Sequence, residues 1–346
     1  MTNSISLPEL GWRPFFQQQL SLDEFEQTRI MRVMAQHRSQ LDLMTEQGNF
    51  HLPVTSSMPT ITVGDWLLVD EQGHFIRLLD RISEFSRKAA GSKIDAQLIA
   101  ANVDTVFIIS SLNDDFNLSR IERYLALTNE AGVEPVIVLT KADCCDNPQT
   151  FVRQVQELDP MLLVETVNGL DRNSVTVLEP WCKTGRTVAF VGSSGAGKST
   201  LINSLQEKQD QATGDIRHDD SKGRHTTTSR SLHVMTAGGL LLDTPGMREL
   251  QLSNCEQGIT ATFADIYSLA EQCRFSDCQH QGEPGCAVRE AIDIGELNER
   301  RLVNYLKLNR EQAINGASIA EKRARSRNLG KYYRSVQNES RKRKKG

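Results

Sequence analysis

The sequence predicts an α/β domain with a largely parallel sheet, placed between a β-rich segment and a cysteine-rich helical segment. Three observations predict this arrangement. Apolar strands alternate with helices over residues 100–255. Short β-rich pieces separated by turn residues fill residues 51–98. Three of the chain's seven cysteines crowd into residues 273–286.

Length and composition fit an ordinary globular protein. The chain has 346 residues, 38% of them hydrophobic and 24% charged. At about 100–200 residues per domain, this length predicts two or three domains. No apolar run approaches the roughly 20 residues that a membrane-spanning helix needs. Because the first twenty residues also lack the pattern of a secretory signal, we expect a cytoplasmic protein without membrane contact. No heptad seam is visible, so we expect a monomer.

Charge is unevenly distributed along the chain. Residues 300–346 hold 15 Lys/Arg and 3 Asp/Glu, a net charge of +12, and the remainder holds 25 and 41, a net charge of −16. An acidic body with a basic tail indicates that the tail binds a polyanion. The alternative is a solubilising, disordered tail.

The segments on the amino-terminal side divide into two units. We expect residues 1–50 to form a helical extension, with its main helix over Leu22–Arg38. Residues 51–99 predict a small β-barrel, with strands within Ile61–Val69, His74–Leu79 and Ile82–Phe85. Trp66 is expected in the core of this barrel rather than as an exposed stacking surface.

The α/β domain is expected over residues 100–255. Its predicted strands are Thr105–Ser110, Pro135–Leu139, Val188–Val191 and Leu240–Asp243, and its predicted helices are Arg120–Ala131 and one from Lys198. Sheets of this kind bind ligands at the carboxyl ends of their strands. The motifs described below fall at those ends.

A phosphate-binding loop follows the predicted strand that ends at Val191. The residues concerned are Gly192, Ser193, Ser194, Gly195, Ala196, Gly197, Lys198 and Ser199, followed by Thr200. They fit G-x-x-x-x-G-K-S/T at every fixed position, between a strand and a helix as the motif requires. The loop N–H groups and the helix N-terminus would bind phosphate oxygens. Lys198 would reach the β- and γ-phosphates, and the Ser199 hydroxyl would bind Mg²⁺.

A second motif, Asp243-Thr244-Pro245-Gly246, ends the last predicted strand. An acidic residue beside a phosphate-binding loop can hold Mg²⁺ through water. The N–H of Gly246 could close on the γ-phosphate. Alone, this D-x-x-G pattern also fits a simple turn. Its occurrence together with the phosphate-binding loop favours a nucleotide-binding role.

A third motif, Thr140-Lys141-Ala142-Asp143, selects the base. A carboxylate at Asp143 can accept two hydrogen bonds from the guanine edge, whereas adenine offers no such pair of donors. The aliphatic part of Lys141 can lie along the base. A backbone N–H to guanine O6 is expected near Thr166, although the sequence there lacks the usual Ser-Ala pair.

The cysteine-rich segment, within residues 256–300, predicts a structural zinc site. Cys273, Cys278, His280 and Cys286 supply three thiolates and one imidazole within fourteen residues. Such a set matches closed, tetrahedral zinc, which could fold a segment too small for its own core. Residues 301–346 are expected to form a basic helix and tail.

The order of the motifs is unusual, since Thr140–Asp143 precedes Gly192–Ser199 along the chain. Ordinary GTPases run in the opposite order. This order, together with Gly64-Asp65-Trp66, Gly223-Arg224-His225-Thr226-Thr227-Thr228 and the cysteine cluster, resembles the circularly permuted ribosome small-subunit biogenesis GTPases, the RsgA (YjeQ) family. The resemblance covers nearly the whole chain from about residue 50.

The resemblance implies further roles. The barrel would be of the OB type. The GTP-bound protein would bind the small ribosomal subunit and its rRNA late in maturation, and hydrolysis of GTP would be followed by release. In the first switch, Thr226 or Thr227 would complete the Mg²⁺ shell. Met247 stands where some GTPases place a water-orienting Gln, so His225 is the candidate catalytic residue, and slow intrinsic hydrolysis raised by the subunit is expected.

Three functions from different classes stay open on the sequence. One is a GTPase acting on the small ribosomal subunit. Another is a nucleotide-gated rRNA-binding module with negligible turnover, which Met247 keeps possible. The third is a metabolic P-loop phosphohydrolase or ATPase, against which Asp143 and the basic tail count.

Overall fold

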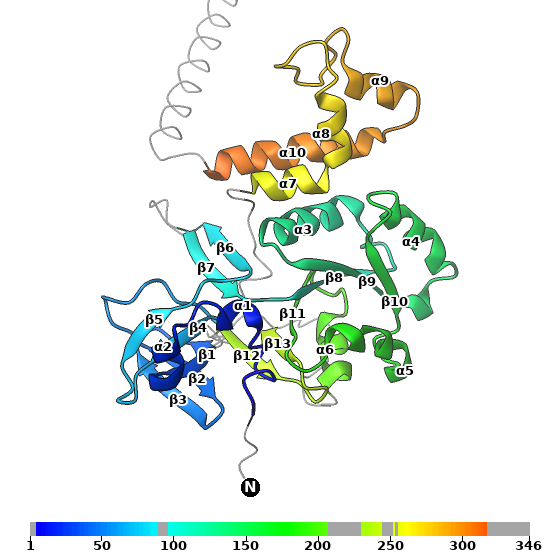
Figure 1. The fold of residues 1–346 in the computed structure, drawn as a ribbon. Coiled ribbons are helices and arrows are strands. Elements are labelled where there is room, and N and C mark those ends of the chain that lie inside the picture. Colours follow the sequence, from blue (N-terminus) through cyan, green and yellow to red (C-terminus); the bar gives the residue numbers. More distant parts are fainter. Residues whose placement is uncertain (1–4, 89–95, 207–229, 244–251, 253–254, 317–346) are drawn as a thin grey trace, which may run out of the picture.

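The computed structural model describes residues 5–88, 96–206, 230–243, 252 and 255–316. Its largest feature is one eleven-stranded sheet in the order β10-β9-β8-β11-β13-β12-β1-β2-β3, with β4 paired to β1 and β5 paired to β4 (Figure 1). A separate hairpin pairs β6 (Glu84–Lys88) with β7 (Ala96–Ala101). The α/β domain and the barrel are therefore two ends of the same sheet.

The α/β half contains the four strands that the sequence predicted, namely β8 (Thr105–Ser111), β9 (Glu134–Thr140), β11 (Thr187–Gly192) and β13 (Leu240–Asp243). It also contains β10 (Leu163–Val167) and β12 (Arg230–Val234), which the sequence analysis did not predict. All neighbours in this half pair in parallel except β12, which is antiparallel to β13. Every residue of β8 and β11 is buried, because helices cover both faces of a parallel sheet.

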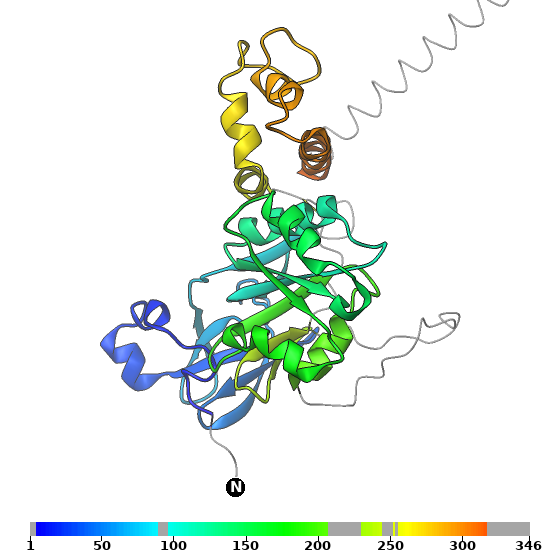
Figure 2. The same ribbon diagram turned by 90° about the vertical axis from the view of Figure 1, so that its right-hand side faces the viewer.

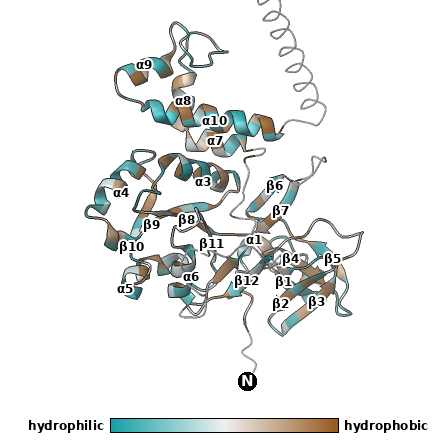
Figure 3. Ribbon diagram, turned by 180° about the vertical axis from the view of Figure 1, so that it is seen from behind, coloured by the Kyte–Doolittle hydropathy of each residue, from teal (hydrophilic) through white to brown (hydrophobic). Residues whose placement is uncertain are grey.

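Helices cover the two faces of this half as separate groups. On one face lie α3 (Leu118–Glu130) and α4 (Pro148–Gln156). On the other lie α5 (Arg172–Val175), the 3₁₀ turn η2 (Thr176–Trp181) and α6 (Lys198–Gln206). In Figure 3 these helices carry both hydrophilic and hydrophobic colours, as expected for helices with one buried stripe.

The barrel half corrects the prediction for the first fifty residues. The predicted helix over Leu22–Arg38 and the helical extension over 1–50 are wrong: α1 (Pro14–Gln17) and α2 (Leu22–Gln27) are short, and a strand begins at Arg29. The barrel strands are β1 (Arg29–Gln36), β2 (Gln40–Thr45), β3 (Gly48–Pro53), β4 (Trp66–Val69) and β5 (Phe75–Leu78). The five-stranded, partly open arrangement fits the expected OB-type barrel, which starts at β1 rather than at residue 51.

Packing on both faces of β1 explains why this strand was not predicted from the sequence. Met31 and Val33 point into the barrel core, whereas Ile30 and Met34 pack into the core shared with the α/β domain. A strand buried on both faces shows no alternation of polar and apolar residues. The run Ile30–Met34 therefore looked like a mixed helical face.

The barrel is attached to the α/β half by packing and hydrogen bonds around Trp66. This residue is fully buried, as predicted, and its ring lies edge-on to Trp12 with centroids 4.9 Å apart. The buried guanidinium of Arg32 donates to the Leu10 carbonyl, to the Asn102 carbonyl (3.1 Å) and to the Thr187 hydroxyl (2.8 Å). These bonds join the amino-terminal segment, the barrel and the start of β11.

Among the described residues from 255 to 316, four helices form the carboxyl-terminal part. They are α7 (Glu256–Thr262), α8 (Ala264–Ala270), α9 (Ala287–Asp293) and α10 (Glu299–Gly316). Figures 1 and 2 show them stacked on the outer side of α3. Gly258 allows the close approach of α7, since a Cβ there would lie 2.0 Å from the Ala126 carbonyl oxygen. Within the part of the chain that the structure describes, no helix is long and apolar enough to span a membrane.

Candidate functional site

Strand register brings the base motif and the phosphate-binding loop to one edge of the sheet. Thr140 pairs with Ser111 on one side and with Val167 on the other, and Gly192 pairs with Ile109. The Thr140 hydroxyl donates to the carbonyl of Ala196 at 2.6 Å, across 56 residues of sequence. The two motifs therefore touch although their order along the chain is reversed.

The phosphate-binding loop has the backbone that its glycines predict. Gly192 ends β11 at φ 148°, where a Cβ would lie 2.4 Å from the carbonyl oxygen of Ile109. Gly197, at φ 88°, precedes α6 directly. Both positions need a residue without a side chain, and together they let the loop turn tightly onto the helix N-terminus.

Lys198 is buried within the phosphate-binding loop. The residue is 8% exposed, and its Nζ donates to the carbonyl of Gly192 (2.8 Å) and to that of Ser193. Ser199 is exposed in the first turn of α6, beside the half-buried Thr200. This arrangement would present an ammonium group and a hydroxyl to a bound polyphosphate.

Asp243 ends β13 at the same edge of the sheet. The preceding residue, Leu242, pairs with Ala189 of β11, the strand that leads into the phosphate-binding loop, and Asp243 itself is exposed. Oxygen ligands from Ser199 and Asp243 suit Mg²⁺. The other predicted switch residues, His225, Thr226, Thr227 and Gly246, lie outside the described residues.

The base motif turns sharply after β9. Lys141 has a left-handed backbone (φ 59°), and Ala142–Cys144 form a 3₁₀ turn that exposes Asp143. The Cys144 thiol donates to the Asp143 carboxylate at 3.4 Å, and this bond raises the pKa of Cys144. The Asp143 carboxylate is therefore exposed, with one oxygen accepting a hydrogen bond from the neighbouring thiol.

The loop after β10 lies against the helix of the phosphate-binding loop. Thr166 itself is within β10, paired with Leu139. The exit loop is held by Ser204 of α6, whose hydroxyl donates to the carbonyl of Gly169 at 2.6 Å. A Cβ on Gly169 would touch the Thr200 side chain at 3.6 Å. Sequence reasoning missed Ser204, since a serine within a helix gives no sign of a partner 35 residues away.

The loop between β8 and α3 also reaches the phosphate-binding loop. The Ser193 hydroxyl donates to the carboxylate of Asp115, which also pairs with Arg120 at 2.8 Å. Sequence reasoning did not single out Asp115. Its place just after an apolar strand, at the edge where ligands bind, was the available signal.

The predicted metal ligands converge at the other end of the molecule. The four ligand atoms of Cys273, Cys278, His280 and Cys286 all lie within 4.8 Å of one another. His280 Nδ1 is 3.4 Å from the sulfur of Cys286 and 3.7 Å from that of Cys273, and those two sulfurs are 4.0 Å apart. Tetrahedral zinc, with Zn–S near 2.3 Å and Zn–N near 2.0 Å, requires separations of about 3.5–3.8 Å. The donor set therefore fits zinc.

The surroundings of the cluster favour metal binding. Burial lowers the pKa of His280, so the neutral imidazole that a metal needs is the stable form. Its carbonyl accepts a bond from Arg289 Nε at 2.8 Å, which fixes the left-handed backbone at φ 59°. On the other side, the Arg274 N–H donates to the Gly285 carbonyl at 3.0 Å and closes the loop.

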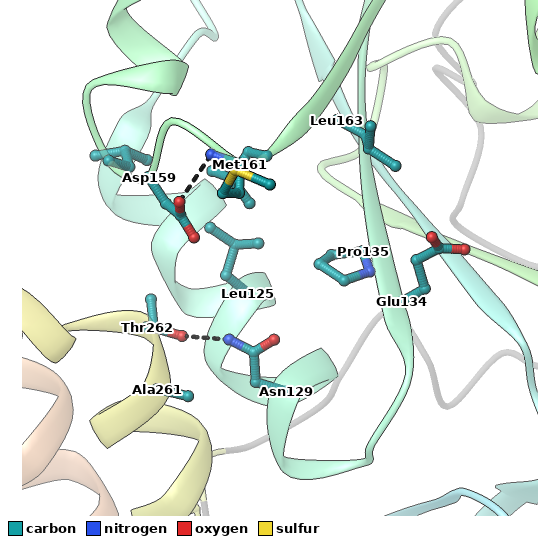
Figure 4. A pocket seen from close by; sticks show the side chains of 11 residues that line it. Leu125, Asn129, Glu134, Pro135, Asp159, Met161, Leu163, Ala261 and Thr262 are labelled. Carbon is teal, nitrogen blue, oxygen red and sulfur yellow. Dashed lines mark hydrogen bonds between the residues drawn. The ribbon is translucent and has the colours of Figure 1, made fainter.

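A cavity of about 290 Å³ lies at the opposite edge of the sheet (Figure 4). Glu134 and Leu163, which begin β9 and β10, line it together with Leu125 of α3 and Thr262 of α7. Because the predicted motifs follow the carboxyl ends of these strands, this cavity is not the nucleotide site.

Comparisons with known proteins agree with this geometry. The profile described as RsgA GTPase matches residues 78–253. The chain is 62% identical over 343 residues to small ribosomal subunit biogenesis GTPase RsgA 2 of Vibrio parahaemolyticus, covering 99% of this chain and 96% of that one. Among solved structures, YjeQ from Thermotoga maritima matches with a TM-score of 0.60 at 24% identity, over 81% of this chain and 97% of that one. YloQ, a circularly permuted GTPase, matches with a TM-score of 0.56 at 23% identity, over 81% and 93%. The two structures share the fold.

Proposed function

Since the chain belongs to the RsgA GTPase family and is thus a GTP hydrolase, we propose that it binds the small ribosomal subunit and assists its late maturation. The observation that carries the nucleotide part is the 2.6 Å bond from the Thr140 hydroxyl to the Ala196 carbonyl. It joins a base-selecting turn to a phosphate-binding loop. The names of the relatives support the ribosomal part.

Each side chain at the edge has a defined task in this proposal. Asp143 accepts two hydrogen bonds from guanine, and Lys141 lies along the base. The loop Gly192–Gly197 and Lys198 bind the phosphates. Ser199 and Asp243, completed by Thr226 or Thr227, would hold a magnesium ion, which when bound neutralises charge on the β- and γ-phosphates.

Hydrolysis without a partner is proposed to be slow. Met247 cannot orient water, and His225 is the candidate within the chain for that task. A partner that positions water for in-line attack would raise the rate. The subunit is proposed as that partner.

Zinc is proposed to hold the segment between α8 and α9. Cys273, Cys278, His280 and Cys286 would be its four ligands, and the ion would act structurally because no open coordination position remains. Together with the barrel and the basic tail, this segment would contact rRNA. We propose that the protein works as a monomer in the cytoplasm, where the subunit matures.

The experiment is GTP hydrolysis with and without purified small subunits, with ATP as the control nucleotide. A large stimulation seen with GTP alone is expected. GTP-dependent binding to the subunit without stimulation would favour the alternative that Met247 suggests, a nucleotide-gated rRNA-binding module with negligible turnover. If the subunit neither bound the protein nor stimulated GTP hydrolysis, the proposed ribosomal function would be wrong. The proposed nucleotide site would not be affected by that result.

A further inference from the structure

Asp115 occupies an unexpected position for a carboxylate. It lies in the loop between β8 and α3, and it accepts a hydrogen bond from the hydroxyl of Ser193, the first variable residue of the phosphate-binding loop. A negative charge beside a site for a polyphosphate would weaken binding unless it had a compensating role. The surroundings of Asp115 show what that role is.

The carboxylate is held from several sides. Its other oxygen, Oδ1, pairs with Arg120 Nη1 at 2.8 Å, and its own N–H donates to the side chain of Asn113 at 3.1 Å. Asn113 in turn accepts from the Ser111 hydroxyl at 2.7 Å, so the loop is anchored to the end of β8. The Ser193 hydroxyl, then Arg120, and to a smaller extent Lys141, hold the pKa of Asp115 below its usual range. The group is therefore ionised at neutral pH and its charge is balanced locally.

Ser193 links this anchored carboxylate to the phosphate-binding lysine. The Ser193 carbonyl accepts from Lys198 Nζ, and so does the Gly192 carbonyl at 2.8 Å. When Lys198 turns toward phosphates it releases both carbonyls, and the backbone at Ser193 then depends on its side chain for orientation. The bond to Asp115 is the side-chain contact that the structure shows there.

We propose that Asp115 is a positioning residue for the phosphate-binding loop: it holds Ser193, and thereby the first turn of the loop, in the conformation that binds the nucleotide. This inference rests on the proposed GTP site. Asp115 acts through Ser193 and does not touch the reacting atoms. It contributes equally to the ground state and the transition state, so its loss changes KM and leaves kcat nearly unchanged.

The test is a double-mutant cycle measured by steady-state GTP hydrolysis and by equilibrium binding of GTP. Asp115→Ala should raise KM and the GTP dissociation constant about tenfold, as expected for one charge-assisted hydrogen bond, with kcat within about twofold of wild type. Asp115→Asn keeps an oxygen acceptor for Ser193 and should recover part of the affinity. In a Ser193→Ala background, Asp115→Ala should have no further effect.

Asp114→Ala is the matched control, because this exposed neighbour makes no side-chain bond to any described residue. Equal GTP affinity in wild type and Asp115→Ala would overturn the proposal. So would additive losses in the Ser193→Ala background, since they would show that Asp115 acts by another route. Failure of the wild-type protein to bind GTP would instead overturn the proposed function itself.

Discussion

At the scale of single residues, one hydroxyl joins the two parts of the nucleotide site. Thr140 is 2% exposed, and its Oγ1 donates to the Ala196 carbonyl. This bond holds the turn Lys141–Asp143 against the loop that we propose binds the phosphates. A nucleotide bound to both would need this fixed spacing. A buried carbonyl that loses its donor costs about 1–3 kcal/mol.

Thr140→Val should therefore lower the affinity for GTP about tenfold, because valine keeps the shape of threonine but cannot donate to Ala196. Equilibrium binding of GTP measures the change. Thr260→Val, at an exposed position of α7, is the control and should bind as wild type does. Unchanged affinity in Thr140→Val would show that the bond does not order the site.

At the scale of elements, α3 connects the α/β domain with the carboxyl-terminal helices. Glu122 of α3 is fully buried and pairs with Arg300 (2.8 Å) and Arg301 (2.9 Å) of α10. Arg123, the next residue of α3, pairs with Glu311, about three turns further along α10, through two bonds of 2.7 and 2.6 Å. The helical part is thus attached by ion pairs, and its attachment depends on charge.

Acid should weaken this attachment through Glu311. Its hydrogen bonds with Arg123 lower the pKa of Glu311 in the folded protein. The pair therefore stabilises the fold fully at pH values above the pKa of the unfolded chain, which is about 4.3. That stabilisation is lost as the pH falls through the lower pKa of the folded protein. At neutral pH Glu311→Gln should cost about 1 kcal/mol. The difference from wild type in unfolding free energy should shrink as the pH falls below about 4.3 and should vanish once the pH is below the folded pKa.

Urea unfolding at a series of pH values measures this difference. Glu290→Gln, at an exposed position of α9 that makes no side-chain bond to the described residues, provides the control. A difference that persisted unchanged into acid would contradict the role given to the Glu311 carboxylate.

The zinc segment makes a separate prediction at this scale. Purified protein should contain about one zinc ion per chain, and Cys278→Ser should lose it because closed sites need all four ligands. Cys144→Ser, outside the cluster, should retain the ion. Metal analysis gives the content, and hydrogen exchange over residues 273–286 should rise when the ion is lost. Full zinc content in Cys278→Ser would remove that residue from the ligand set.

At the scale of the whole molecule, one sheet carries both the barrel and the nucleotide site. Strand β12 pairs with β13 on one side and with β1 on the other. The buried Arg32 strengthens this junction, and although burial lowers its pKa to about 10 the guanidinium stays charged at neutral pH. The barrel is therefore rigidly placed relative to the edge where nucleotide would bind.

How much the sequence predicts depends on where each residue's partners lie. The strands around Val188–Val191 and Pro135–Leu139 were predictable because burial on both faces leaves a plain apolar run. The cluster of three cysteines and His280 was predictable because its members are close in sequence. By contrast β1 was mistaken for a helix, since its outward face is buried by the amino-terminal segment, which local patterns do not reveal. Asp115 and Ser204 were missed because their roles come from partners that only folding brings near.

Selectivity of nucleotide binding is the property to measure first, because we propose that Thr140–Asp143 and Gly192–Ser199 form one guanine-specific site despite their reversed order. We would measure equilibrium affinities for GTP and ATP in the wild-type protein and in Asp143→Ala. We expect wild type to prefer GTP by at least about 10³-fold, and Asp143→Ala to lose most of this preference through weaker GTP binding alone. Equal affinities for GTP and ATP in wild type, or undiminished selectivity in Asp143→Ala, would contradict this proposal.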